Sequence, residues 1–177
     1  MILIALAALA APMAAAGTGQ PYTLVLKGAD GPNAISISFD GTSDEYVIHA
    51  NGTVGQTETC TNPPGEPNEL RCPEDDLIGF TVRAGGGNDD IIVKDSVALS
   101  TTLNGGAGLD DLAGGSNTDR LVGGADEDKL VGRKGSDFLY GSKGRDTLLG
   151  GAGKDVLRGG PGRDVIRGGP GRDDERQ

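Results

Sequence analysis

The chain has 177 residues, of which 36% are hydrophobic and only 3% aromatic, and this shortage of large apolar side chains excludes an extensive globular core. Its 32 glycines are far above ordinary usage but below the one-third that a collagen sequence requires, so a turn-rich architecture of short period is expected. The net charge of −10 disfavours nucleic acid as a partner of the whole chain and suits either cation binding or solubility alone.

An apolar segment begins the sequence. It reads MILIALAALAAPMAAAG, and Ala14 and Ala16 are placed as in an A-x-A cleavage signal before Gly17. No Lys or Arg precedes the apolar run, which departs from the usual signal, and the run is too short to span a bilayer comfortably. We expect residues 1–16 to be a signal peptide, and the mature protein to be secreted and extracellular without a stable membrane span. A lipid-facing anchor and a buried helix are the alternatives.

Four short strands are predicted next, because four segments alternate apolar and polar residues with a period of two. They are YTLVLK (22–27), AISISF (34–39), EYVIHA (45–50) and IGFTVR (78–83). The dipeptides Asp40-Gly41 and Asn51-Gly52 are typical of hairpin turns. The sequence therefore predicts a small β cap over residues 17–83, with no catalytic cluster in it.

Two cysteines, Cys60 and Cys72, enclose the turn-rich segment TNPPGEPNELR. A pair this close in an exported protein is more typical of a disulfide than of two free thiols. Closing a loop of this size would stabilise the fold by roughly 3 kcal/mol. A zinc site is disfavoured, since the sequence has no further Cys and its one histidine is His49.

From residue 105 to residue 176 the sequence divides without a gap into eight nonapeptides: GGAGLDDLA, GGSNTDRLV, GGADEDKLV, GRKGSDFLY, GSKGRDTLL, GGAGKDVLR, GGPGRDVIR and GGPGRDDER. Position one is always Gly, position six is always Asp, and position eight is Leu or Ile in the first seven copies. A linker has no reason to keep an aliphatic residue in phase, so this period predicts a repeat architecture.

These motifs resemble the haemolysin-type calcium-binding repeat, the nonapeptide of the RTX family of secreted bacterial calcium-binding proteins. AGGGNDDII (84–92) is similar to one earlier copy, and the twelve residues VKDSVALSTTLN separate it from the main run. The resemblance implies a right-handed parallel β-roll in which two nonapeptides form one coil, so that residues 18 apart stack on the same edge. We therefore expect an all-β chain with a β-roll over residues 84–177 behind the N-terminal β cap.

The nonapeptide pattern also explains why calcium is the expected ligand. Stacked strands lie about 4.8 Å apart, so aspartates in successive coils would repel one another without a cation between them. Calcium takes six to eight oxygens from carboxylates and main-chain carbonyls, and glycine lets those carbonyls approach. The predicted carboxylate ligands are Asp89, Asp110, Asp119, Asp128, Asp137, Asp146, Asp155, Asp164 and Asp173. The predicted loop glycines are Gly105, Gly106, Gly108, Gly123, Gly141, Gly144, Gly150, Gly151, Gly153, Gly159, Gly160, Gly162, Gly168 and Gly171.

Eight repeats offer at most six full sites between coils, with sub-millimolar to millimolar affinity, and we expect metal binding to be coupled to folding. A metal-free roll whose aspartates only bind turn amides is the alternative. Ligation stays open near Asn117, Asp126, Arg133 and Ser142, each of which replaces a loop glycine. Bases at position five should weaken binding by repulsion.

An enzyme is disfavoured. One histidine excludes an H-E-x-x-H zinc site, no G-x-S-x-G motif occurs, and GGAGKD lacks the flanking residues of a phosphate loop. We expect a protein without catalytic residues. The non-catalytic part of a secreted hydrolase or toxin system remains an alternative, because members of the resembled family carry such repeats.

Two binding functions are further alternatives. The Arg-Gly-Gly sequences at 158–160 and 167–169 resemble single-strand-binding RGG boxes, but the acidic chain and the alternating aspartates disfavour nucleic acid. A calcium-stiffened adhesion module would use the outward Phe138 and Tyr140, with Val122 and Val156 beside them. All four are also ordinary strand formers, and the sequence identifies no protein partner.

Overall fold

The computed structural model describes residues 22–28, 30–51, 60–74 and 77–177. The expected signal peptide and Gly52 of the second turn dipeptide lie outside these ranges. The described residues form fifteen β-strands and no helix. None of them belongs to a helix long and apolar enough to cross a membrane. The expected all-β fold class is confirmed.

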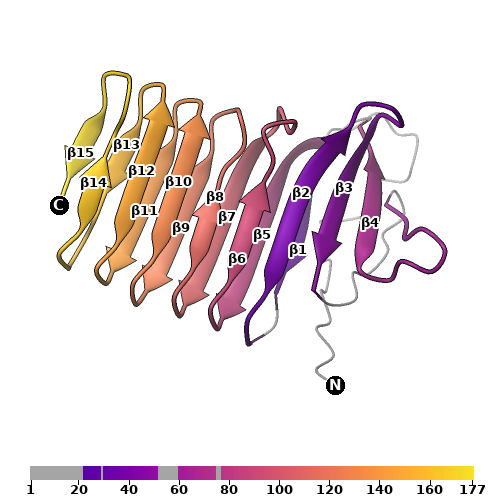
Figure 1. Cartoon of the computed structure of the whole chain (residues 1–177), viewed down its shortest axis with the longest axis horizontal. Helices are drawn as coiled ribbons and strands as arrows, with labels where there is room; N and C mark the ends of the chain where they lie inside the picture. Colours follow the sequence, from indigo (N-terminus) through magenta and orange to yellow (C-terminus); the bar gives the residue numbers. More distant parts are fainter. Residues whose placement is uncertain (1–21, 29, 52–59, 75–76) are drawn as a thin grey trace.

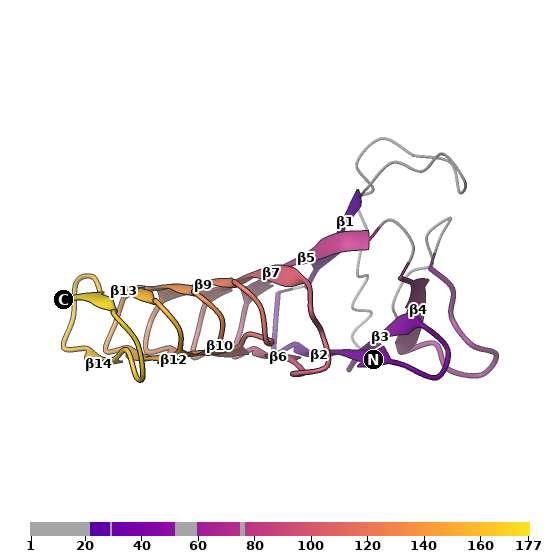
Figure 2. The ribbon, with the colours of Figure 1, turned by 90° about the horizontal axis from the view of Figure 1, so that it is seen from above.

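Two long sheets lie face to face, and their strands follow one another along the molecule like rungs (Figures 1 and 2). The first sheet contains, in spatial order, β1 (Tyr22–Lys27), β5 (Leu77–Gly86), β7 (Ser100–Ala107), β9 (Arg120–Ala125), β11 (Phe138–Lys143), β13 (Val156–Arg158) and β15 (Asp174–Arg176). The second contains β14 (Val165–Arg167), β12 (Thr147–Ala152), β10 (Lys129–Lys134), β8 (Asp111–Ala113), β6 (Asp90–Val93), β2 (Ala34–Asp40), β3 (Glu45–Ala50) and β4 (Glu69–Pro73).

From β5 onward the chain crosses from one sheet to the other at every strand, which makes a parallel β-solenoid of about five turns over residues 79–176. Equivalent residues of successive coils are 18 apart. In the second sheet Leu112 pairs with Leu130, which pairs with Leu148; in the first, Leu121 pairs with Leu139, which pairs with Leu157. The predicted stacking of two nonapeptides per coil is confirmed.

The interior of the solenoid is a double row of position-eight side chains. Within positions seven to nine of each copy, only position eight points its side chain inward. The leucines at this position have 0% exposure; they are Leu112, Leu121, Leu130, Leu139, Leu148 and Leu157. Ile166 is partly buried against the same core. Positions seven and nine are more exposed in most copies, so the expected assignment of position eight to the core is confirmed.

Both sheets continue beyond the repeats. Strand β1 pairs in parallel with β5, and β2 pairs in parallel with β6, so the strands of the expected cap add to the stack of coils. Among the described strands, only the pairs β2–β3 and β3–β4 are antiparallel, and β3 and β4 end the second sheet (Figure 1). The proposed division at residue 84 therefore marks a change in sequence pattern and not a break in either sheet.

Aromatic rings and a disulfide stabilise this end of the molecule. The Tyr46 ring lies 4.9 Å from the Phe39 ring and 5.4 Å from the Phe80 ring, measured between centroids. Cys60 and Cys72 are buried and form the disulfide expected from their spacing.

The four predicted strands are present with nearly the predicted bounds, and β2 and β3 form a hairpin in which Asp40 pairs with Glu45, as the Asp40-Gly41 dipeptide indicated. Strand β4 was not predicted. Its alternation is carried by Leu70 and Cys72 alone, beside a run rich in proline and glycine that reads as a loop.

Leu139→Ala is expected to lower the free energy of unfolding by about 2–5 kcal/mol, because the fully buried side chain fills the space between two coils. Val165→Ala is the control: its side chain is 46% exposed, and the change should stay within about 0.5 kcal/mol. Urea unfolding in excess calcium measures both. Equal losses would contradict the separation of inner and outer positions.

Candidate metal sites

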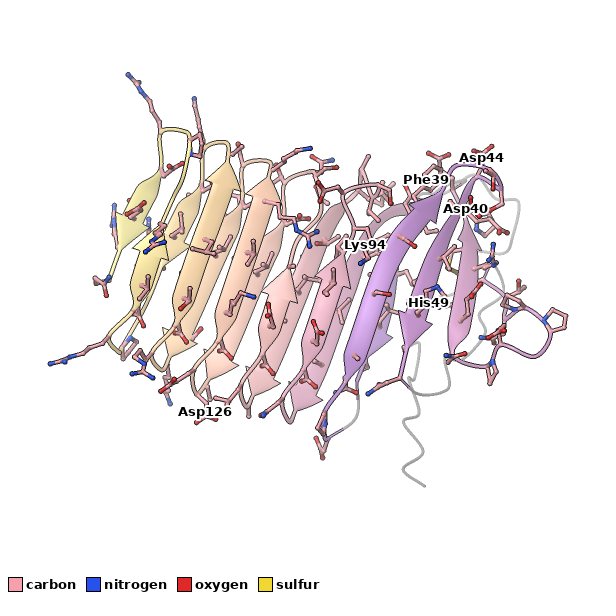
Figure 3. The ribbon with its side chains drawn as sticks, in the orientation of Figure 1. Phe39, Asp40, Asp44, His49, Lys94 and Asp126 are labelled. Carbon is pink, nitrogen blue, oxygen red and sulfur yellow. A yellow bond between two sulfur atoms is a disulfide. The ribbon has the colours of Figure 1, made fainter. Side chains whose placement is uncertain are left out.

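The loops between the two sheets lie along two opposite edges of the solenoid. The first edge carries the loops that run from the first sheet to the second and end at Asp89, Asp110, Asp128, Asp146 and Asp164. The second edge carries the returning loops, which end at Asp119, Asp137, Asp155 and Asp173. Figure 3 labels Asp126 in one loop of the first edge, at the lower ends of the strands. The structure thus places the predicted carboxylates in the two rows expected from an 18-residue coil.

A ladder of hydrogen bonds joins the aspartates of each row. In seven of the nine aspartates, Oδ1 accepts a hydrogen bond from the main-chain N–H of the aspartate in the preceding coil, with N···O distances of 2.8–3.0 Å. The first aspartate of each row, Asp89 or Asp119, accepts from the N–H of Asn33 or Thr101 instead. The amide hydrogen bonding considered as a metal-free alternative is therefore present. It uses only one of the two carboxylate oxygens.

The second oxygen has no donor in most loops. Among the described residues, the buried Oδ2 atoms without a hydrogen-bond partner are those of Asp89, Asp110, Asp128, Asp137, Asp146, Asp155 and Asp164. A buried carboxylate oxygen without a partner is costly, so each of these atoms is positioned to gain from a cation.

Position one is glycine because this oxygen occupies the space of a side chain. A Cβ built on Gly141 would lie 2.3 Å from Oδ2 of Asp146, and one built on Gly105 would lie 2.1 Å from Oδ2 of Asp110. Both distances are far below van der Waals contact. The Asp at position six of each nonapeptide therefore requires Gly at position one, because a side chain there would collide with the carboxylate.

Main-chain carbonyls provide a second set of oxygens in the loops. A Cβ built on Gly151 would lie 2.0 Å from the carbonyl oxygen of Arg133, and one built on Gly153 would lie 1.5 Å from that of Gly135. Both glycines have positive φ, 108° and 149°. The carbonyls at positions two and four thus point along the stack toward the next coil, which suits a cation that prefers oxygen ligands.

The electrostatic environment of the aspartates also favours a cation. Burial raises the pKa of Asp110 to about 6 and the pKa values of Asp128 and Asp137 to about 7; the main-chain hydrogen bond opposes this shift, and neighbouring aspartates in the stack add to it. Burial likewise raises the pKa of Asp146 and of Asp155. A bound divalent cation would stabilise the charged form of each carboxylate.

Three of the four replaced glycines keep the loop conformation. Asp126, Arg133 and Ser142 have φ of 79°, 77° and 84°, in the left-handed region that glycine normally occupies. Asn117 does not have positive φ. Its Nδ2 donates to the carbonyl of Ala98, and its Oδ1 accepts from the N–H of Thr118. Of the loops left open by the sequence, the one at 114–119 is therefore the one that departs in conformation.

The carboxylate of Asp119, in this loop, differs from the others because both of its oxygens have donors. Oδ1 accepts from the N–H and the hydroxyl of Thr101, at 2.7 and 2.8 Å, and Oδ2 accepts from the N–H of Gly115 at 2.7 Å. Burial raises the pKa of Asp119, and these hydrogen bonds and the charge of Arg133 oppose the rise.

The segment GADGPNAIS, which begins at Gly28, is a degenerate copy of the loop that was not predicted. A Cβ on Gly28 would lie 2.8 Å from Nδ2 of Asn33, the same relation as between positions one and six of a repeat. Asn33 donates to Oδ1 of Asp89 through its main-chain N–H and its Nδ2, at 2.7 and 2.8 Å. Glycine at position one, Asn at position six and Ile35 at position eight were the available signal.

The outer face of the first edge is a shallow groove with several acids, lined in part by Asp90, Asp111, Glu127 and Arg145. Two ion pairs cross it between residues 18 apart. Lys129 Nζ lies 2.6 Å from Oδ2 of Asp111, and a guanidinium nitrogen of Arg145 lies 2.8 Å from a carboxylate oxygen of Glu127. The position-five base Arg145 is thus paired with an outer acid and not with an inner aspartate.

The outward aromatic residues of the first sheet lie as expected. Phe138 pairs with Val156, and Tyr140 pairs with Val122. The guanidinium carbon of Arg120 lies 4.4 Å from the centroid of the Tyr140 ring, which covers part of that ring.

Side chains alone do not complete a metal site. In the described part of the chain, no group of three or more His, Cys, Asp or Glu side chains is arranged to hold a metal ion. A cation in these loops would need main-chain carbonyls beside the aspartates. The buried Oδ2 atoms without donors and the carbonyls directed along the stack fit that requirement.

Comparison with known families gives one match. A family model described as the RTX calcium-binding nonapeptide repeat (4 copies) matches residues 102–121, 113–148, 122–157 and 140–174. No match was found among curated proteins or among solved structures.

Gly141→Ala is expected to weaken calcium binding and to lower stability by about 1–3 kcal/mol, because the new Cβ would collide with Oδ2 of Asp146. Gly41→Ala in the β2–β3 turn is the control, since its Cβ would have nothing nearer than the Phe39 ring at 3.9 Å. Thermal unfolding and calcium titration measure both variants. If the two behaved alike, the packing of Gly against Asp would not matter for the site.

The metal-free protein is expected to be more stable at about pH 5 than at pH 8. Folding raises the pKa of Asp110, Asp128 and Asp137 from an ordinary 3.8 to about 6 or 7. A raised carboxyl pKa gives stability that is fully present below the ordinary pKa and is lost as the pH rises through the folded value. Melting curves of chelator-treated protein against pH test this, and a melting temperature that rises steadily from pH 5 to 8 would contradict it. Excess calcium should remove or reverse the dependence.

Proposed function

Because residues 102–174 form an array of RTX calcium-binding nonapeptide repeats, we propose that the protein binds several calcium ions in the loops of its β-solenoid and that this binding is coupled to folding of the array. The proposed role is not catalytic. The observation that carries the proposal is the row of buried Oδ2 atoms without donors along both edges.

The proposed ligands follow the ladder of aspartates. The carboxylates in question are those of Asp89, Asp110, Asp128, Asp137, Asp146, Asp155 and Asp164, whose Oδ2 atoms have no donor. Asp173 lies at the same position of the last repeat and is only partly buried. Carbonyls of loop positions two and four would supply the remaining oxygens. Eight repeats would allow at most six full sites between coils, and five pairs of these carboxylates are 18 residues apart, because both oxygens of Asp119 have protein donors.

The chain's own residues prepare these sites. Oδ1 of each aspartate is held by the amide of the preceding coil, which fixes the carboxylate, while position-one glycine leaves space for Oδ2. The leucines of position eight set the distance between coils. Bound calcium would supply positive charge between carboxylates that otherwise repel one another.

Folding of the repeats should depend on the metal because little else stabilises them. Each of the first seven copies contributes one inward aliphatic side chain, and each buried carboxylate opposes folding when it is charged. Calcium at tenfold excess over the dissociation constant contributes roughly 1.4 kcal/mol per site, so several sites are comparable with the stability of a small domain.

We further propose that the protein acts outside the cell. The apolar N-terminal sequence supports export, and the disulfide between Cys60 and Cys72 is typical of oxidising compartments. Calcium sites of the expected sub-millimolar to millimolar affinity would be occupied at extracellular calcium concentrations.

Calcium titration of the purified protein, followed by far-UV circular dichroism and by calorimetry, tests the proposal directly. We expect several bound ions and a gain of β signal. Unchanged spectra with no bound metal would contradict both calcium binding and its coupling to folding.

Asp128→Asn is expected to lower calcium affinity about tenfold or more at its loop, because it removes a buried charge whose Oδ2 has no protein partner. Asp111→Asn is the matched control. Asp111 lies one position beyond Asp110 on the outer face, and its carboxylate pairs with Lys129. Calorimetry should show the loss in the first variant and parental binding in the second; equal losses would point to a general charge effect in place of specific ligation.

A further inference from the structure

Arg133 makes contacts unlike those of any other position-two residue in the described repeats. Its Nη1 donates to the carbonyl oxygen of Val93 at 2.5 Å and to that of Gly114 at 3.0 Å, and it lies 3.3 Å from Oδ1 of Asp95. The Arg133 side chain is 29% exposed. One positive group thus joins three oxygens from two successive coils.

The two carbonyls are equivalent positions of the solenoid. Strand β6 pairs with β8 so that Ile91 lies beside Leu112 and Ile92 beside Ala113. The next residues, Val93 and Gly114, therefore begin the loops of successive coils on the second edge. The guanidinium thus bridges two successive coils through carbonyls that neighbour those of positions two and four, which are proposed for calcium.

In the loop of residues 114–119, beside Arg133, both carboxylate oxygens of the aspartate already have hydrogen-bond donors. Both oxygens of Asp119 have protein donors, Thr101 and Gly115, whereas Oδ2 is without a donor in the loops of Asp137 and Asp155 on the same edge. A guanidinium that bridges two coils and an aspartate with donors for both oxygens thus occur on the same edge. Each observation is independent of the other.

We propose that the guanidinium of Arg133 supplies, at the loop of residues 114–119, the positive charge that calcium would supply between other coils, so that the junction between the cap-side coils and the repeats is held together without metal. This inference rests on the proposed calcium binding of the other loops. It predicts that Asp119, although it matches the repeat pattern, is not a calcium ligand, and that the loop of residues 114–119 stays ordered in chelator.

Hydrogen exchange of the full-length protein in chelator, read by mass spectrometry, tests this directly. Arg133→Met keeps an L-residue at φ 77° and a long apolar stem but removes the charge. We expect peptides covering residues 93–119 to lose protection in chelator by about tenfold or more in exchange rate, and Arg133→Lys to retain most of it. Lys134→Met is the matched control, because Lys134 lies 3.8 Å from the same Asp95 but is 67% exposed and contacts neither carbonyl.

Each outcome decides the inference. Unchanged protection in Arg133→Met would show that the stem, and not the charge, stabilises the loop, and an equal loss in Lys134→Met would show a general charge effect; either result overturns the proposal. Bound calcium, measured in parallel on each protein, should be no lower in Arg133→Met than in the parent. A lower count would mean that Arg133 supports a metal site in place of substituting for one. If the parent bound no calcium, the proposed function would fail while the comparison in chelator still stood.

Discussion

The contact between position-one glycine and position-six aspartate is the constraint on which the rest of the solenoid depends. A coil this narrow has room for one aliphatic side chain per strand and one carboxylate per loop, and the carboxylate fits only where glycine has no Cβ. Burial of that carboxylate between coils raises its pKa and leaves one oxygen without a donor. A bound cation would stabilise these buried carboxylates. The packing that forms the solenoid therefore also forms the proposed calcium sites.

Much of this arrangement could be predicted because the repeats are so short. When a strand has one inward residue, a single aliphatic position in the period identifies the core, and the nine-residue phase then fixes every loop. The division of the two carboxylate oxygens could not be predicted, since it depends on how far one coil lies from the next. Nor could the continuation of the sheets through β1 and β2, where Asn33 stands in the place of aspartate and the period is lost.

Positive charge enters the solenoid in different ways along its length. In the proposed calcium loops it would come from solution, whereas Arg133 supplies it from the chain, and Asn33 avoids the need by being neutral. The nonapeptide motif alone does not predict the contacts of Arg133. Its carbonyl partners are 19 and 40 residues away, so no local sequence pattern identifies them. A replaced glycine that reads as a defect in the sequence is, in three dimensions, a residue with a specific set of contacts.

The sequence repeats every nine residues, but the coil that stacks contains 18. Loss or duplication of one nonapeptide in the gene would leave every motif intact and yet move all later repeats to the opposite edge. The ion pairs of Lys129 with Asp111 and of Arg145 with Glu127 would then face different residues. Loss or duplication of two would preserve each cross-coil partner. Such an array can therefore change length by recombination without altering its cross-coil contacts only in pairs of repeats. The nine-residue period of the sequence does not reveal this restriction.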